Sequence, residues 1–244
     1  MTRTFAIGDI HGGLRALEQL LERIELTDDD ILIFVGDYVD GWSESAQVIQ
    51  YLINLSKHQE CVFIKGNHDL WCEDWLRTKN GFSVWLEHGG SETIESYVKF
   101  SKEEKTKHLH FFENLLPYHI DEHGRLFIHA GYTSMHGVGK ETFKQNFYFD
   151  RTLWEMALAM KDTIEEDSVF YPKRLRHYTE IFIGHTPTIN FNCIEPMHAA
   201  NVWNVDTGAA FYGKLSAIDV NTKAIFQSDV VQSLYPDENG RNKS

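Results

Sequence analysis

Five short segments of this sequence end in side chains that can bind a metal ion or transfer a proton. Each segment is a run of β-branched and aromatic residues that stops at a glycine or a polar residue. The reactive residues that follow the runs are Asp9, His11, Asp37, Asn67, His68, His129 and His185. Such a mixture of carboxylate, amide and imidazole groups suits divalent ions that keep positions open for water and substrate. The pattern predicts a metal site assembled from distant parts of the chain.

The same residues indicate a hydrolytic reaction at phosphorus. Two divalent ions about 3.5–4 Å apart can clamp the attacking and leaving oxygens of an in-line displacement, and a water that bridges them becomes the nucleophile near neutral pH. Asp37 can bridge the ions, and Asn67 is interpreted as an oxygen ligand. We expect His68 to be the general acid that protonates the leaving group. Asp40 is the candidate carboxylate that fixes the His68 tautomer.

The elements that must position these residues follow from hydrophobic periodicity. The apolar runs have the length and composition of strands buried on both faces, and they lie in segments 4–9, 31–37, 61–68, 125–131 and 180–186. Residues 13–24 and 43–55 between the first three runs place apolar side chains on one helical face. Strand–helix alternation predicts βαβ units with a parallel sheet, whose strands deliver ligands at their carboxyl ends.

The remaining chain predicts a single α/β domain. Residues from 69 to about 119 look helical and amphipathic, and strands dominate from residue 182 onward. We expect one domain over residues 1–235 and a polar, flexible tail over residues 236–244.

Five motifs in this order resemble the signatures of the calcineurin-like metallophosphoesterases. They are GDIHG (8–12), GDYVDG (36–41), GNHD (66–69), HAG (129–131) and GHT (184–186). More narrowly, the chain is similar to the phosphoprotein-phosphatase branch, which includes bacterial serine/threonine phosphatases and symmetrical diadenosine tetraphosphatases. The segments WLEHGGSETIESY and DTGAAFYGKLSAIDV extend the likeness over nearly the whole chain.

This resemblance implies a fold, a metal centre and an activity. The implied fold is a four-layer sandwich in which two mixed β-sheets pack together between helices. The first ion would be held by Asp9, His11 and Asp37, and the second by Asp37, Asn67, His129 and His185. His68 would be the acid and Asp40 its partner. Manganese is the expected metal, with iron and zinc as alternatives.

One position departs from the family pattern. The second signature of the phosphatase branch usually reads GDYVDRG, and its arginine contacts the substrate phosphate, whereas this chain has Gly41. Loss of that arginine removes a bidentate, charge-assisted clamp. Arg151 is the preferred replacement, and the basic cluster Lys173, Arg174 and Arg176 is an alternative.

Composition restricts the partners and the compartment. The chain has 36 acidic and 23 basic side chains, so its formal net charge of −13 argues against binding a nucleic acid polymer. Three cysteines without a CxxC pair, no membrane-length apolar stretch and no leader pattern indicate a cytoplasmic protein. Spacing of the P-loop or dinucleotide-fold type is absent. The other histidines are interpreted as surface, loop or turn residues: His58, His88, His108, His110, His119, His123, His136, His177 and His198.

Three functions remain open on the sequence. The first is a phosphomonoesterase that acts on phosphoserine or phosphothreonine in a protein, or on a small phosphoester. The second is hydrolysis of a dinucleoside polyphosphate or another nucleotide. The third is a non-catalytic metal-binding scaffold, against which the Asp40–His68 pair argues. The sequence leaves the oligomeric state open.

Overall fold

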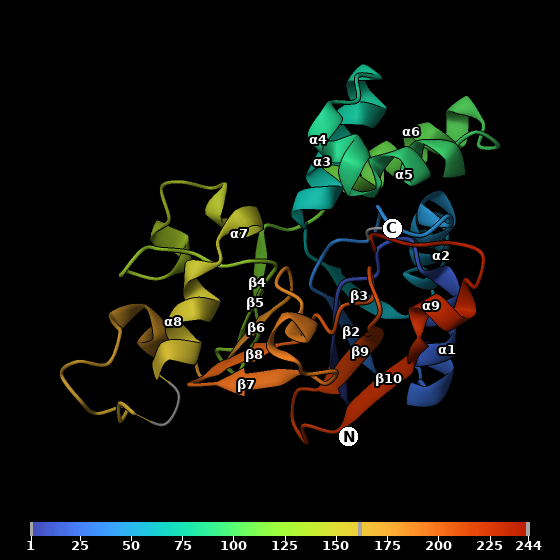
Figure 1. Cartoon of the computed structure of the whole chain (residues 1–244). Coiled ribbons are helices and arrows are strands. Elements are labelled where there is room, and N and C mark those ends of the chain that lie inside the picture. Colours follow the sequence, from blue (N-terminus) through green and yellow to red (C-terminus); the bar gives the residue numbers. More distant parts are fainter. Residues whose placement is uncertain (1, 161–162, 243–244) are drawn as a thin grey trace.

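Two five-stranded β-sheets pack face to face, and helices cover their outer faces (Figure 1). The computed structural model describes residues 2–160 and 163–242. The strand order is β10-β9-β1-β2-β3 in the first sheet and β4-β5-β6-β8-β7 in the second. The strands are β1 (Thr4–Ile7), β2 (Ile31–Phe34), β3 (Glu60–Phe63), β4 (Tyr118–Ile120), β5 (Leu126–Ile128), β6 (Ile181–Ile183), β7 (Met197–Ala199), β8 (Val202–Asn204), β9 (Lys214–Asp219) and β10 (Ile225–Val230).

The first sheet starts with the predicted βαβ units. Strands β1, β2 and β3 are parallel, and helices α1 (Leu14–Ile24) and α2 (Ser45–Leu55) connect them. Helix α1 buries Leu17, Leu21 and Ile24, as its apolar spacing requires. The expected strand–helix alternation is therefore confirmed.

A helical segment follows β3 and covers one side of the site. Its elements are α3 (Asn67–Thr78), α4 (Ser83–Trp85), the π-helical turn η1 (Leu86–Gly90), α5 (Ser91–Ser96) and α6 (Lys102–Glu113). Short non-helical stretches separate these helices, and the predicted helical segment is wrong at its end, because His119 lies in strand β4 and pairs with Phe127 of β5. Sheet pairing there overrides the local helical pattern.

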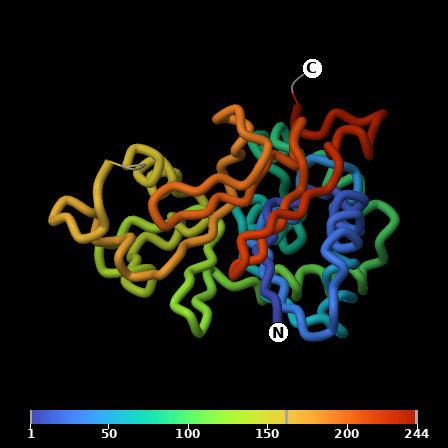
Figure 2. The backbone as a smooth tube through the Cα atoms, turned by 90° about the horizontal axis from the view of Figure 1, so that it is seen from below, coloured from blue at the N-terminus to red at the C-terminus, as the bar shows by residue number. Residues whose placement is uncertain are grey.

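The second sheet has a parallel centre and antiparallel edges. Strands β5, β6 and β8 are parallel, whereas β4 and β7 pair antiparallel at the two edges. The helices of this half are η2 (Val138–Lys140), α7 (Asn146–Phe149), α8 (Thr152–Met160), η3 (Lys173–His177) and η4 (Thr188–Phe191). Strands β9 and β10 then return to the first sheet, where β9 runs antiparallel beside β1 (Figure 2).

The apolar layer between the sheets explains why the strands lack a polar face. Ala6 and Ile33 from the first sheet pack in one cluster with Phe127 and Phe182 from the second. The rings of Phe127 and Phe182 stack with centroids 4.9 Å apart. Neighbouring residues on β1, such as Phe5, point the other way and pack in the cluster that includes α1. Burial on both faces is thus confirmed for the central strands.

The C-terminal segment packs against the first half of the chain. Helix α9 (Val231–Leu234) follows β10, and the Tyr235 ring then stacks on Trp42 at 5.1 Å. The Glu238 carboxylate accepts hydrogen bonds from the Ser43 amide and hydroxyl at 2.9 and 2.6 Å. The described part of the predicted tail therefore makes tertiary contacts, while residues 243 and 244 lie outside the described residues. Within the described ranges, no helix has the length and apolar character to cross a membrane.

Candidate active site

The predicted site residues converge where the carboxyl ends of five strands meet. Asp9 and His11 follow β1, Asp37 follows β2, Asn67 and His68 open α3, His129 follows β5 and His185 follows β6. Most of them line a cavity of about 380 Å³, whose walls are His11, Asp37, Asn67, His68, Trp71, His88, Phe149, Arg151, His185, Pro187, Asn190, Asp206, Phe211 and Arg241. Asp9 and His129 are buried beside it.

Asp37 lies at the centre of the cluster. Its Oδ2 is 3.7 Å from His11 Nε2 and 3.3 Å from His129 Nε2. His11 Nε2 is also 4.0 Å from Asp9 Oδ2, and His129 Nε2 is 3.2 Å from Asn67 Oδ1. Asp37 therefore lies between two groups of potential ligands, which is the position that a bridging carboxylate would occupy.

The two central histidines are oriented by backbone carbonyls. His11 Nδ1 lies 2.8 Å from the Asp40 carbonyl oxygen, and His129 Nδ1 lies 2.9 Å from that of Val35. These contacts fix the tautomer in which Nδ1 carries the proton and donates it. Each Nε2 then faces the carboxylates, where its lone pair would bind a metal ion, as metal-binding histidines with such partners do.

Asp9 carries an unpartnered buried atom that a metal ion would satisfy. Its Oδ2 accepts a hydrogen bond from the His185 amide at 3.0 Å, whereas its buried Oδ1 has no partner in the described part of the chain. A Cβ atom at Gly184 would lie 2.1 Å from that Oδ1, so only glycine leaves room for the carboxylate. An unpaired buried carboxylate oxygen is costly. The residues therefore fit a bound cation.

The acidic residues of the cluster repel one another. Burial, followed by the charges of Asp206 and Asp37, raises the pKa of Asp9 well above its usual range. Burial also raises the pKa of Asp206, to about 6. A divalent cation would remove this penalty and hold both carboxyls ionised. His185 has a pKa well below its usual range because of burial, so it is neutral and able to bind a metal.

His68 and Asp40 form a hydrogen-bonded pair. His68 Nδ1 donates to Asp40 Oδ2 at 2.7 Å. Trp85 Nε1 donates to the same oxygen at 2.7 Å, and the Thr93 hydroxyl donates to Oδ1 at 2.6 Å. Burial raises the pKa of Asp40, and the hydrogen bonds from Thr93 and Trp85 oppose that rise. Three converging donors favour the carboxylate, which leaves His68 Nε2 directed away from Asp40.

Asp69 links the loop of the second motif to that of the third motif by hydrogen bonds. Its carboxylate accepts hydrogen bonds from the backbone amides of Asp37, Tyr38 and Gly66 at 2.8, 2.9 and 2.7 Å. A Cβ atom at Gly66 would lie 2.1 Å from Asp37 Oδ1, which explains the glycine before Asn67. Four site residues also have positive φ: His11 (52°), Asp37 (54°), Asp40 (73°) and His185 (67°). Such strained backbone concentrates at functional sites.

Two groups of side chains have ligand atoms close enough to hold one ion each. One group is His11, Asp37 and His68, and the other is Asp37, His129 and His185. The first group contains His68, which the sequence predicts to be the general acid. The ligand set expected for that ion has Asp9 in place of His68. His68 differs from the other site histidines because its Nδ1 is paired with a carboxylate instead of a carbonyl, and such pairing suits a proton donor.

Several cavity residues carry no signal in the sequence that marks them as functional. Asp206 is a partial exception, because it follows β8 at a strand end, where the sequence suggests a residue that lines the site without a direct role, and it is 3% exposed. His88, interpreted from the sequence as a turn residue, lies in η1 at the cavity wall. Arg241 comes from the segment expected to be flexible, so no local pattern marks it.

The predicted phosphate contact Arg151 also lines the cavity, and its Nη1 donates to the Thr186 hydroxyl at 3.1 Å.

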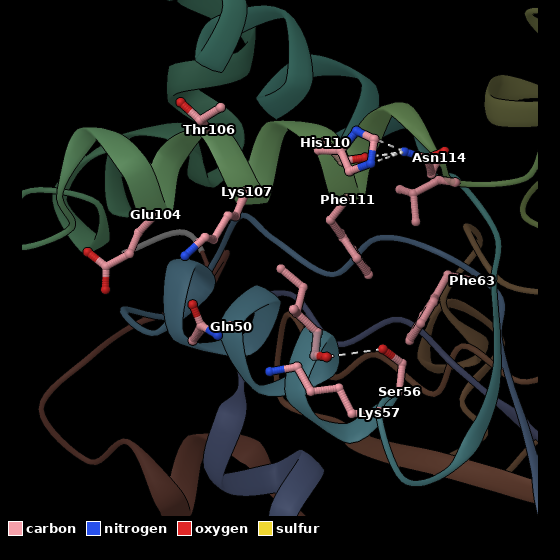
Figure 3. Close-up of a pocket in the computed structure, with 12 residues that line it drawn as sticks. Gln50, Ser56, Lys57, Phe63, Glu104, Thr106, Lys107, His110, Phe111 and Asn114 are labelled. Atoms are coloured by element: carbon pink, nitrogen blue, oxygen red, sulfur yellow. Dashed lines mark hydrogen bonds between the residues drawn. The ribbon is translucent and has the colours of Figure 1, made fainter.

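A larger cavity lies elsewhere in the molecule. It measures about 870 Å³ and lies between α2 and α6, with Gln50 and Lys57 on one side and Lys107 and Phe111 on the other (Figure 3). Among the described residues, its walls combine apolar side chains with lysines and lack a cluster of histidines and carboxylates. The chemistry therefore belongs to the smaller cavity.

Comparison with known proteins agrees with this geometry. The family model described as calcineurin-like phosphoesterase matches residues 2–213. The bis(5'-nucleosyl)-tetraphosphatase PrpE [asymmetrical] of Oceanobacillus iheyensis is 30% identical over 231 residues, which cover 86% of each chain. Its namesake from Anoxybacillus flavithermus is 29% identical over 227 residues and covers 87% of this chain and 88% of its own.

Solved structures share the fold at lower identity. A serine/threonine phosphatase from Saccharomyces cerevisiae aligns with a TM-score of 0.61 at 14% identity, covering 93% of this chain and 80% of its own. A metallophosphoesterase from Sphaerobacter thermophilus aligns with a TM-score of 0.54 at 15% identity, covering 93% and 87%. With the family model matching most of its length, this chain belongs to the calcineurin-like phosphoesterases and is a metal-dependent phosphoester hydrolase.

Proposed function

We propose that this enzyme uses two divalent ions to hydrolyse a phosphoanhydride bond of a dinucleoside tetraphosphate. The observation that carries the proposal is the grouping of six potential ligands beside the Asp40–His68 pair around one cavity. The PrpE relatives, which carry a tetraphosphatase name, support this substrate class. The sequence prediction favoured a phosphoprotein substrate, with a symmetrical dinucleoside tetraphosphatase or another nucleotide phosphoesterase as one alternative and a non-catalytic metal-binding scaffold as the other.

The cavity wall supports a nucleotide over a compact phosphoester. Trp71, Phe149 and Phe211 line it together with the reactive side chains. The Trp71 ring lies 4.9 Å from the His68 ring and 5.8 Å from that of Phe149. Phe149 is 39% exposed although it borders the site. Exposed aromatic faces can stack on a nucleobase, which contributes about 1–3 kcal/mol per base.

The metal ligands are proposed as the family resemblance implies them. Asp9, His11 and Asp37 would hold one ion, and Asp37, Asn67, His129 and His185 the other. Manganese is the proposed metal, and iron and zinc suit the same ligands. Two ions held there would polarise the phosphoryl oxygens and lower the pKa of a bound water.

The protein groups complete the reaction. His68 is the proposed general acid. Burial lowers its pKa to about 3, but Asp40, which accepts from its Nδ1, and the nearby Asp37 favour the imidazolium, whose Nε2 proton would pass to the departing oxygen. Water supplies a hydroxyl to the attacked phosphorus and a proton to the leaving nucleotide. Asymmetrical cleavage then yields a nucleoside triphosphate and a monophosphate, whereas symmetrical cleavage yields two diphosphates.

A phosphomonoesterase that acts on phosphoserine or phosphothreonine is the second candidate. The Asp40–His68 pair favours it, because a departing alkoxide needs a proton more than a departing polyphosphate does.

The cytoplasmic location stays a prediction from the sequence.

Product analysis distinguishes these candidates. Metal-stripped protein would receive Mn²⁺ and then diadenosine tetraphosphate, a phosphoserine peptide or p-nitrophenyl phosphate, with chromatography of the products. We expect ATP and AMP from the dinucleotide, whereas two ADP would indicate symmetrical cleavage. Turnover of the monoesters alone would replace the dinucleotide proposal with the second candidate. No turnover of any of the three by protein with two bound ions would contradict both.

A further inference from the structure

The C-terminal segment is anchored directly beside the second motif. Tyr235 stacks on Trp42, and Glu238 binds Ser43, so both contacts fall on the residues that follow Gly41. The Arg241 amide then donates to the Ala210 carbonyl oxygen at 2.8 Å. Figure 1 shows this red segment leaving α9 and turning back toward the middle of the molecule. These contacts give Arg241 a defined position.

The side chain of Arg241 enters the reactive cavity at the place where Gly41 lacks a side chain. Arg241 lines the cavity together with His11, Asp37 and His68. A Cβ atom at position 41 would lie 3.4 Å from Arg241 Cγ, in ordinary contact. Gly41 has φ of 136°, a backbone conformation that favours glycine. A longer side chain at position 41 would be strained and would compete with Arg241 for this space.

The guanidinium of Arg241 lies near several carboxylates but forms no ion pair with any of them among the described residues. Burial lowers the pKa of Arg241, and the charges of Asp37, Asp40 and Asp206 oppose that change, so the group stays charged. It stacks over the Phe211 ring at 5.2 Å. Among the described residues, no side-chain hydrogen bond or ion pair ties up its N–H groups. A planar cation held in this way can bind a phosphate bidentately.

We propose that Arg241 binds a phosphate group of the substrate. It would thereby replace the arginine that the phosphatase branch usually has at position 41. The inference rests on the proposed phosphoester substrate. It makes the C-terminal segment a component of the active site, with Trp42 and Ser43 as its anchor. Arg151 would contact the phosphates from the α8 side, where its Nη1 is bonded to Thr186.

Binding of inorganic phosphate to Mn²⁺-loaded full-length protein tests this proposal separately from turnover. The affinity would be measured by calorimetry for wild type, Arg241→Gln and Arg241→Lys, with bound metal measured in each. Because a charge-assisted hydrogen bond contributes about 1.5–3 kcal/mol, we expect Arg241→Gln to weaken phosphate binding by about 10- to 100-fold, with Arg241→Lys in between. The metal content should stay unchanged.

Two controls separate the role of Arg241 from a change in net charge and from an effect of shortening the chain. Arg77→Gln deletes the same charge from an exposed side chain that pairs with Glu73 and Glu113, and it should bind phosphate as wild type does. A chain that ends after Gly240 should behave as Arg241→Gln, whereas one that ends after Asn242 should behave as wild type. These variants decide the question even if one substitution impairs folding.

Unchanged phosphate affinity in Arg241→Gln at full metal occupancy would overturn the proposal, and Arg241 would then only balance the carboxylates. If wild type binds phosphate through Arg241 but cleaves no dinucleotide, the proposed substrate fails and the role of Arg241 stands.

Discussion

At the scale of single residues, the reactive groups are held by neighbours that do no chemistry themselves. Trp85 and Thr93 donate to the Asp40 carboxylate, and that carboxylate in turn orients His68. Asp69 gathers three backbone amides around the loop that carries Asp37. Preorganised donors and acceptors of this kind keep a site in its working geometry before substrate arrives.

Replacement of His68 tests its role as the acid. His68→Ala should retain the fold and both metal ions but lose turnover by about 10²–10⁴-fold, the usual contribution of general acid catalysis. The loss should be larger for an alkyl phosphate than for p-nitrophenyl phosphate, whose leaving group needs little protonation. Kinetics on both substrates and metal analysis of the same samples check this. Loss of one metal ion would instead make His68 a ligand.

Replacement of Asp69 tests the support of the loops. Asp69→Ala leaves three buried amides without acceptors, at about 1–3 kcal/mol for each unsatisfied group, so the thermal midpoint and the metal affinity should both fall. Asp69→Asn keeps an acceptor oxygen and should lose less. Thermal unfolding with and without Mn²⁺ measures both effects, and unchanged values in Asp69→Ala would refute this supporting role.

The sequence predicted the residues that follow apolar runs, because a polar ligand type at a strand end is a local signal. Asp37, His129 and His185 are residues of this kind. Arg241 carries no such signal, since its place depends on contacts between residues about two hundred positions apart. The two kinds of residue differ in whether local sequence or tertiary packing places them.

At the scale of elements, the helical segment is held together by a buried histidine that the sequence pattern placed on the surface. His108 of α6 is 0% exposed, so that interpretation was wrong. Its Nδ1 lies 3.0 Å from the Tyr97 hydroxyl, and its Nε2 lies 3.2 Å from Gln50 Oε1 of α2. The surrounding charge run looks like a solvated helix face, and only packing reveals the exception.

His108 should make stability depend on pH. Burial lowers its pKa from 6.5 to about 4, so the folded state binds its proton less readily than the unfolded chain. Its contribution is therefore fully present above pH 6.5 and is lost as pH falls toward 4, by up to about 3 kcal/mol. Denaturant unfolding between pH 7 and 4 would show it. His108→Gln should unfold with a shallower pH dependence over this window, and an identical slope would exclude His108 as the cause.

The elements themselves were predicted unevenly. Long periodic segments such as α1 were evident from the sequence, because eleven residues of helical spacing leave little ambiguity. The three-residue edge strands β4 and β7 were not, since strands of that length exist only through their partners β5 and β8. The pairing of the second sheet was implied by the family resemblance alone.

At the scale of the whole molecule, the C-terminal part of the chain packs against the N-terminal part and contributes to the same cavity. Strand β9 pairs with β1, and the residues after α9 cover Trp42 and reach the cavity. Figures 1 and 2 show the red and blue parts of the chain side by side. The site therefore depends on both ends of the sequence being in place.

Tyr235 should be essential for holding the C-terminal segment against Trp42. Its side chain is 1% exposed, stacks on Trp42, and donates its hydroxyl proton to Glu44. Tyr235→Ala should lower the free energy of unfolding by about 3–5 kcal/mol, as loss of a buried aromatic ring does. Tyr235→Phe keeps the ring and should cost only about 1 kcal/mol. Denaturant titrations compare the two, and an equal cost would show that the hydroxyl, and not the stacked ring, holds the segment.

The proposed mechanism depends most on two ions that share Asp37, and the electron paramagnetic resonance spectrum of Mn²⁺-loaded protein tests that directly. We expect two Mn²⁺ per chain with an exchange-coupled spectrum, because both ions would be bridged by one carboxylate. Asp37→Asn should lose the coupling and most of the metal. One ion per chain, or two ions that give only the spectrum of isolated Mn²⁺, would contradict the binuclear site.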